Sequence, residues 1–167
     1  MQRCSVPDRS PPIKVESKTL DATTALTPDN LNTTPAAGDN GTATARVEQV
    51  KITVGGIAPV TIELGVVQAT AKATCATGPG GLAPVLTGAS GISYLKINGI
   101  SVTVGSAPLT VPLVVGALKL NATTTTPTSV TQQAVVLDTL LTDVVISEAH
   151  ADIHGSTANP TGNPCRV

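Results

Sequence analysis

Apolar and polar residues alternate along much of this chain, in many short stretches. A period of two places every second side chain on the same face of an extended strand. No segment keeps the 3.6-residue period of an amphipathic helix. The pattern therefore predicts an all-β protein. It is clearest in one run where polar residues separate Val67, Ala69, Ala71, Ala73 and Cys75.

The alternating runs and the turns between them predict about eight to ten short strands. The Asn98-Gly99 pair favours a type I′ hairpin, because both residue types tolerate positive φ. Many short strands with frequent turns are typical of an antiparallel β-sandwich, here expected to be of Greek-key type. The candidate strands are residues 13–19, 42–54, 60–64, 67–75, 94–97, 100–104, 109–113, 114–121, 128–137 and 141–153.

The chain divides into three parts by composition. Residues 1–41 contain several prolines and an Asp/Asn/Gly cluster, which predicts an extended N-terminal arm or linker. Within this arm, Ile13 and Val15 alternate with charged residues as a half-buried strand requires. Residues 42–156 are expected to form the sandwich, and residues 157–167 a cysteine-bearing tail.

Composition adds an expected location. Only 13% of the residues are charged, whereas soluble domains average about a quarter. The chain has no Phe or Trp and a single Tyr, Tyr94, so its core must be built from aliphatic side chains. We expect an extracellular or cell-surface protein. A net charge of −1 does not indicate the basic surface that nucleic-acid binding requires. The longest apolar stretch, residues 111–118, is too short for a transmembrane segment.

The three cysteines fit a disulfide better than a metal or redox site. No C-x-x-C pair is present, which disfavours a zinc knuckle or a thioredoxin-like site. We expect Cys75, at the end of a strand-like run, to bond with Cys165 in the tail. The alternative is two unpaired buried thiols. Cys4 is left over, either as a free thiol or for an intermolecular bond.

Three stretches of the sequence resemble the choice-of-anchor P family of secreted bacterial surface proteins. They are the Ala/Thr run ending at Cys75, residues 95–104 around the Asn-Gly turn, and residues 142–153, which are similar to the family's closing strand. The resemblance spans residues 42–153. It implies an extracellular β domain without an established reaction. No counterpart of the family's C-terminal anchor is recognised, so simple wall attachment is not expected.

Residues capable of binding a metal recur at every second position near the end of the chain: Glu148, His150, Asp152 and His154. On a strand they share one face, and such ligands suit zinc, copper or nickel. Tetrahedral zinc usually takes ligands from more than one segment, so we expect a solvent-facing polar strand without metal. No other pattern points to a cofactor. The Gly-Ala-Ser-Gly run at residues 88–91 is not a nucleophile elbow, and we expect no enzyme.

Three Asn-x-Thr triplets make glycans a candidate modification, at Asn32, Asn40 and Asn121. The Thr-rich run at residues 123–128 is a second candidate, for O-linked sugar. The alternative is an unmodified polar surface.

The function favoured by these features is structural: the repeating subunit of an extracellular surface or matrix fibre. Ile13 and Val15 are candidates for a donor strand that adds to the sheet edge of a neighbouring copy, which would give self-association into a filament. The alternative is that the arm folds back and completes its own sandwich. The second function considered is a surface adhesin or binding module for carbohydrate or another cell-surface partner. It is weakened by the scarcity of aromatic residues.

Overall fold

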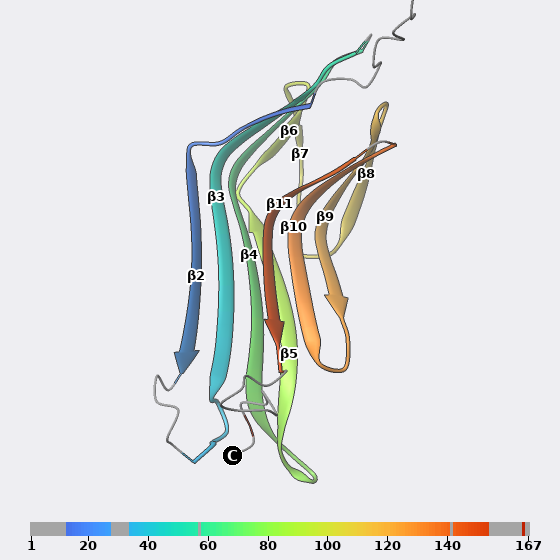
Figure 1. The fold of residues 1–167 in the computed structure, drawn as a ribbon. Helices are drawn as coiled ribbons and strands as arrows, with labels where there is room; N and C mark the ends of the chain where they lie inside the picture. Colours follow the sequence, from blue (N-terminus) through green and yellow to red (C-terminus); the bar gives the residue numbers. More distant parts are fainter. Residues whose placement is uncertain (1–12, 28–33, 57, 141, 154–164, 166–167) are drawn as a thin grey trace, which may run out of the picture.

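Two antiparallel sheets pack face to face in the computed structural model, which describes residues 13–27, 34–56, 58–140, 142–153 and Cys165 (Figure 1). None of these residues forms a helix long and apolar enough to span a membrane. The all-β sandwich expected from the alternating pattern is confirmed. The strands are β1 (Ile13–Glu16), β2 (Thr19–Thr27), β3 (Asn40–Val54), β4 (Val60–Gly78), β5 (Gly81–Ile92), β6 (Leu95–Ile97), β7 (Ile100–Val102), β8 (Leu109–Leu113), β9 (Gly116–Thr125), β10 (Ser129–Thr139) and β11 (Asp143–Asp152).

The large sheet contains β1 to β7, and the small sheet has the order β11-β10-β9-β8. In the large sheet β1 and β2 both pair with β3, while β5 and β6 both pair with β4. Among the described strands, consecutive strands pair in each sheet with two exceptions: β1 pairs with β3 along the same edge as β2, and β6 pairs with β4 along the same edge as β5. The Greek-key connection expected from the sequence is therefore not found, because each sheet is completed by successive hairpins before the chain crosses to the other.

Both sheets bend along a line that crosses their strands. The pairing of β1 with β3 and that of β2 with β3 share one register, interrupted only at residues 17 and 18. Gln49 in β3, Asn121 in β9 and Ser147 in β11 have positive φ at this line. Buried positions also change phase there, since Leu64 and Gly65 of β4 are both buried. Before this point the even-numbered residues of β4 are buried, and after it the odd-numbered residues are buried. A single continuous strand therefore looks like two separate strands in the sequence.

The hydrophobic core lies between the two sheets, and its buried apolar side chains are all aliphatic. Its largest fully buried side chains come from both sheets and include Ile52, Ile62, Leu64, Leu118 and Leu137. Valine and alanine fill the remaining space, as the lack of aromatic residues requires.

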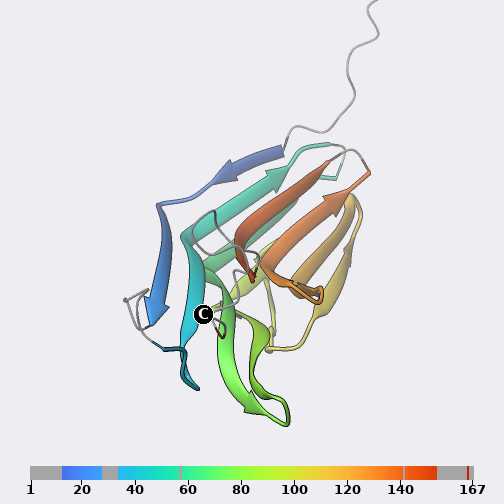
Figure 2. The same ribbon diagram turned by 60° about the horizontal axis from the view of Figure 1, so that its bottom comes forward.

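The N-terminal arm is longer and more regular than expected. Its described part pairs with β3 of the same chain from Ile13 to Thr27, so the predicted boundary at residue 42 falls inside β3. All nine residues of β2 are nevertheless exposed. The reason is that β11 packs on β3 and β4, while β2 lies beyond it at the margin of the large sheet (Figure 2).

Candidate functional site

A groove runs between β2 and β11, the last strand of the small sheet. We call it the edge groove. On the large sheet its floor includes the inner-facing side chains of Thr24 and Leu26, and on the small sheet its wall includes His150. The groove exists because β2 has no strand of the small sheet opposite it. The lining residues are Thr24, Ala25, Leu26, Gly41, Thr42, Ala43, Ala73, His150, Ala151 and Asp152.

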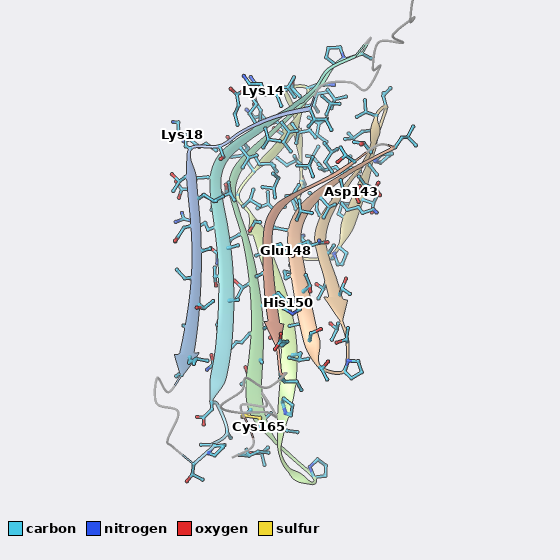
Figure 3. All side chains as sticks on the ribbon, viewed as in Figure 1. Lys14, Lys18, Asp143, Glu148, His150 and Cys165 are labelled. Atoms are coloured by element: carbon cyan, nitrogen blue, oxygen red, sulfur yellow. A yellow bond between two sulfur atoms is a disulfide. The ribbon has the colours of Figure 1, made fainter. Side chains whose placement is uncertain are left out.

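The groove combines exposed apolar side chains with a polar strand. Leu20 is 78% exposed and Leu26 56% exposed, both on the inner face of β2. The alternation along β11 places Ala149 inward and buried, while Glu148 and His150 face solvent (Figure 3). An apolar face of this kind beside a strand edge is a typical place for another strand to bind.

Two of the candidate metal ligands on β11, Glu148 and His150, form hydrogen bonds with side chains of β10. Gln133 donates to Glu148 at 2.7 Å, and His150 Nδ1 lies 2.8 Å from Thr131 Oγ1. His150 Nε2 lies 3.6 Å from Asp152 Oδ2. The solvent-facing orientation is as expected. The described residues contain no group of three that could hold a metal, and His154 lies outside them.

The Cys75–Cys165 disulfide is present, with the two Cα atoms 5.3 Å apart. Both cysteines are buried. Cys75 is also held by two backbone hydrogen bonds, one from its N–H to Asp39 and one from Gly38 to its carbonyl. The tail is thus bonded to β4 at the end of the large sheet away from β1 (Figure 3). Cys4 lies outside the described residues.

The glycosylation candidates have different environments. Asn40 is partly buried, and its side chain bonds to Gly38 and Thr42. Asn121 is only 3% exposed, and its amide donates to the carbonyls of Gly105 and Ala107. A glycan on that nitrogen would remove a donor and could not fit inside the sandwich, so the prediction for Asn121 is wrong. Asn32 lies outside the described residues.

Asn121 belongs to a chain of hydrogen bonds that joins the two sheets. Its Oδ1 accepts from Ser90 Oγ at 2.7 Å, and Ser90 Oγ accepts from Gln132 at 2.9 Å. Gln132, 1% exposed, also accepts from Thr123. Gly88 leaves room for it, since a Cβ there would lie 2.5 Å from Gln132 Oε1. This network was not predicted from the sequence. Gln132 does alternate in phase with the apolar residues Val130 and Ala134. The alternation of Leu118 and Leu120, however, places Asn121 on the outward face, and only the change of phase at the bend buries it.

Two exposed ion pairs shift the pKa values of their members. Lys14 bonds to Glu16 at 2.7 Å and lowers the pKa of that carboxyl. Lys119 bonds to Asp138 at 2.6 Å, which lowers the pKa of Asp138 and raises that of Lys119. Both pairs are open to solvent, so their contribution to stability is small. The first pair shows that β1 carries charges of both signs.

No family model, curated protein or solved structure matches this chain. The resemblance to the choice-of-anchor P family stays a prediction. Function is therefore argued from the arm, the edge groove and the disulfide.

Proposed function

We propose that this protein is an extracellular structural β-sandwich protein, the repeating subunit of a surface or matrix fibre. Assembly is by strand addition, in which the N-terminal arm of one copy pairs with the sandwich of the next. The observation that carries the proposal is that all nine residues of β2 pair with β3 through the backbone while all nine remain exposed.

Such a strand is held to β3 mainly through its backbone. Val15 is still 42% exposed and Ile13 is only partly buried, so β1 also buries little apolar surface. The same backbone hydrogen bonds can form between two copies, which is the physical basis of strand exchange. Little apolar burial is lost while the arm changes partner. A head-to-tail exchange that does not close into a ring gives a filament.

The extracellular location is supported by the disulfide and by the low content of charged residues. Structural disulfides persist in oxidising compartments and are rare in the cytosol. With 13% charged residues, the exposed faces are formed largely by threonine hydroxyls and small side chains.

A covalent lock on the arm tests the proposal. Glu16 of β1 and Lys51 of β3 are directly opposite, a separation that a disulfide can bridge. In a Cys4→Ser background, oxidised Glu16→Cys/Lys51→Cys protein should remain monomeric by light scattering and electron microscopy, whereas Glu16→Cys alone should assemble. The matched control is Thr44→Cys/Thr70→Cys, which locks β3 to β4 and leaves the arm free. Fibres from the arm-locked protein, or a full-length protein that stays monomeric at high concentration, would refute the proposal.

The second candidate function, an adhesin for carbohydrate, is favoured by one observation. Tyr94 is 48% exposed, and a Cβ at Gly65 would lie 2.6 Å from its ring. The small glycine thus lets one edge of the aromatic ring pack against β4 at the bend, while the ring stays half exposed for a sugar to stack on. Binding to a glycan array that disappears in Tyr94→Ala while assembly is unchanged would support this function.

A further inference from the structure

The edge groove lacks one strand of the sandwich. The small sheet ends at β11, and β11 packs over β3 and β4. A strand added to the outer edge of β11 would therefore lie opposite β2. It would cover inner-face side chains such as Leu26, which is 56% exposed. The described residues contain no strand in that position.

The backbone of β11 is oriented to accept such a strand. The N–H of Ile153 donates to Thr128 of β10 at 2.9 Å. In an antiparallel pair, alternate residues exchange hydrogen bonds with the same neighbour. The backbone groups of Ala151 and Ala149 therefore face β10, and those of His150 and Glu148 face the outer edge.

The chemistry of β11 also sets what the added strand must carry. Its inward positions must be apolar, to lie against β2 and β3. Its outward positions lie directly opposite Glu148, His150 and Asp152, where opposite charges attract and like charges repel. The strand must therefore alternate apolar residues with a cation opposite Glu148, a hydrogen-bonding group opposite His150 and a cation opposite Asp152.

We propose that the occupant of the edge groove is β1 of a second copy of this chain. Antiparallel addition places Lys18 opposite Glu148, Glu16 opposite His150 and Lys14 opposite Asp152. The first and third pairs join opposite charges, and in the second the Glu16 carboxylate can accept a hydrogen bond from the His150 ring. The same register turns Ile13 and Val15 inward, opposite Ile153 and Ala151.

The contact is between molecules. Within one copy, β1 pairs with residues 51–54 of β3. Lys14 and Lys18 lie near the bend of the large sheet, away from His150 on β11 (Figure 3). Donor and acceptor are different surfaces, so the contact is head-to-tail and, where it does not close into a ring, propagates as a filament. This inference rests on the proposed function and names the acceptor edge that the arm uses.

Charge reversal tests the pairing of Lys18 with Glu148. Each single variant, Lys18→Glu or Glu148→Lys, replaces an attraction by a repulsion, since opposed charges on paired strands contribute roughly 0.2–1 kcal/mol. The concentration at half-assembly should rise by about 2-fold to 30-fold. The double variant, and an equimolar mixture of the two single variants, should assemble like the wild type.

Lys72→Glu is the matched control. Lys72 faces outward on β4 between Thr42 and Thr87. Its reversal changes the net charge by the same amount as Lys18→Glu and does not touch the proposed contact. Its half-assembly concentration should not change. If Glu148→Lys weakens assembly and the double variant does not recover it, the charge pairing is wrong.

Three results separate this inference from the proposed function. Weakened assembly in both single variants, with recovery in the double variant, supports both. Unchanged assembly in Glu148→Lys, with the arm lock still preventing fibres, refutes the acceptor edge and leaves strand exchange standing. A full-length protein that never assembles refutes both.

Discussion

Replacing Asn121 by aspartate tests whether the two sheets are joined by a buried polar network. The substitution keeps the shape of the side chain and its tolerance of positive φ, which is 56° at this position. It exchanges the amide nitrogen for an oxygen. That oxygen would face the carbonyls of Gly105 and Ala107, which the nitrogen contacts at 2.7 and 3.0 Å.

The expected loss follows from these two contacts. Gly105 and Ala107 are exposed, so their carbonyls can bond to water once the amide is gone. Each lost hydrogen bond is worth about 0.5–1.5 kcal/mol net, so the two together should lower the free energy of unfolding by about 1–3 kcal/mol. Single domains are stable by only about 5–15 kcal/mol, so this is a measurable part of the total. In urea, a loss of about 3 kcal/mol moves the midpoint down by roughly 1–3 M.

The loss should depend on pH with a definite sign. Burial beside two carbonyl oxygens should raise the pKa of the introduced carboxyl above its usual value of about 3.9. Below that value the group is protonated in both the folded and unfolded states, and its hydroxyl can donate to one carbonyl. As the pH rises through the raised pKa of the folded state, the penalty grows to its full size. The difference from wild type should therefore be larger at pH 7 than near about pH 3.5.

Asn98→Asp is the matched control, measured by the same urea titrations followed by circular dichroism. Asn98 also has positive φ, but its side chain is exposed and accepts from the N–H of Thr61 at 2.8 Å. A carboxylate accepts that bond equally well, so stability should stay within about 0.5 kcal/mol of wild type. If Asn121→Asp at pH 7 matched wild type as closely as this control does, the buried network would be refuted.

Three further outcomes are expected. Gly88→Ala should lower stability by about 1–3 kcal/mol, because its Cβ would overlap the glutamine of the polar network. Gly91→Ala is its control: nothing lies within 4 Å of the new Cβ, so its melting temperature should match that of the wild type. Cys165→Ser, which opens a bridge between residues 90 apart, should cost about 2–4 kcal/mol, and an unchanged melting temperature would contradict this. The pKa of Asp138, lowered by Lys119, should return towards its ordinary value in Lys119→Ala when followed by carboxyl NMR. The stability from that pair is present at neutral pH and is lost as pH falls through the lowered pKa.

The strands could be predicted from the sequence because period two is local information. The inward face of β4 from Val67 to Cys75 is the set that the alternation indicated. Strand length could not be predicted in the same way. The change of phase at Leu64 and Gly65 divides β4 into two apparent runs, although its pairing with β3 is continuous in register. Whether a strand continues across a bend depends on its pairing with the neighbouring strand. The alternation of residues within one strand carries no information about that pairing.

The sites show the same division. Cys75 and Cys165 could be paired from their number, spacing and context. The burial of Asn121 could not be predicted, because its partners come from β5 and from the segment before β8, which the fold brings beside it. The edge groove depends on how far one sheet extends past the other. That offset is a property of the packing of the two sheets, and neither sheet's sequence records it.

The position of the disulfide also decides which part of the molecule carries tension. A force applied between Ile13 and Cys165 is carried by β1, β2, β3 and β4. It then passes from Cys75 to Cys165 through the disulfide. Ile13 and Cys75 lie at opposite ends of these strands, so the force runs along the strands and must shear many backbone pairs together. Residues 76–164, and with them the whole small sheet, lie outside the covalent path of the force. Reducing the bond would redirect the same force through β11.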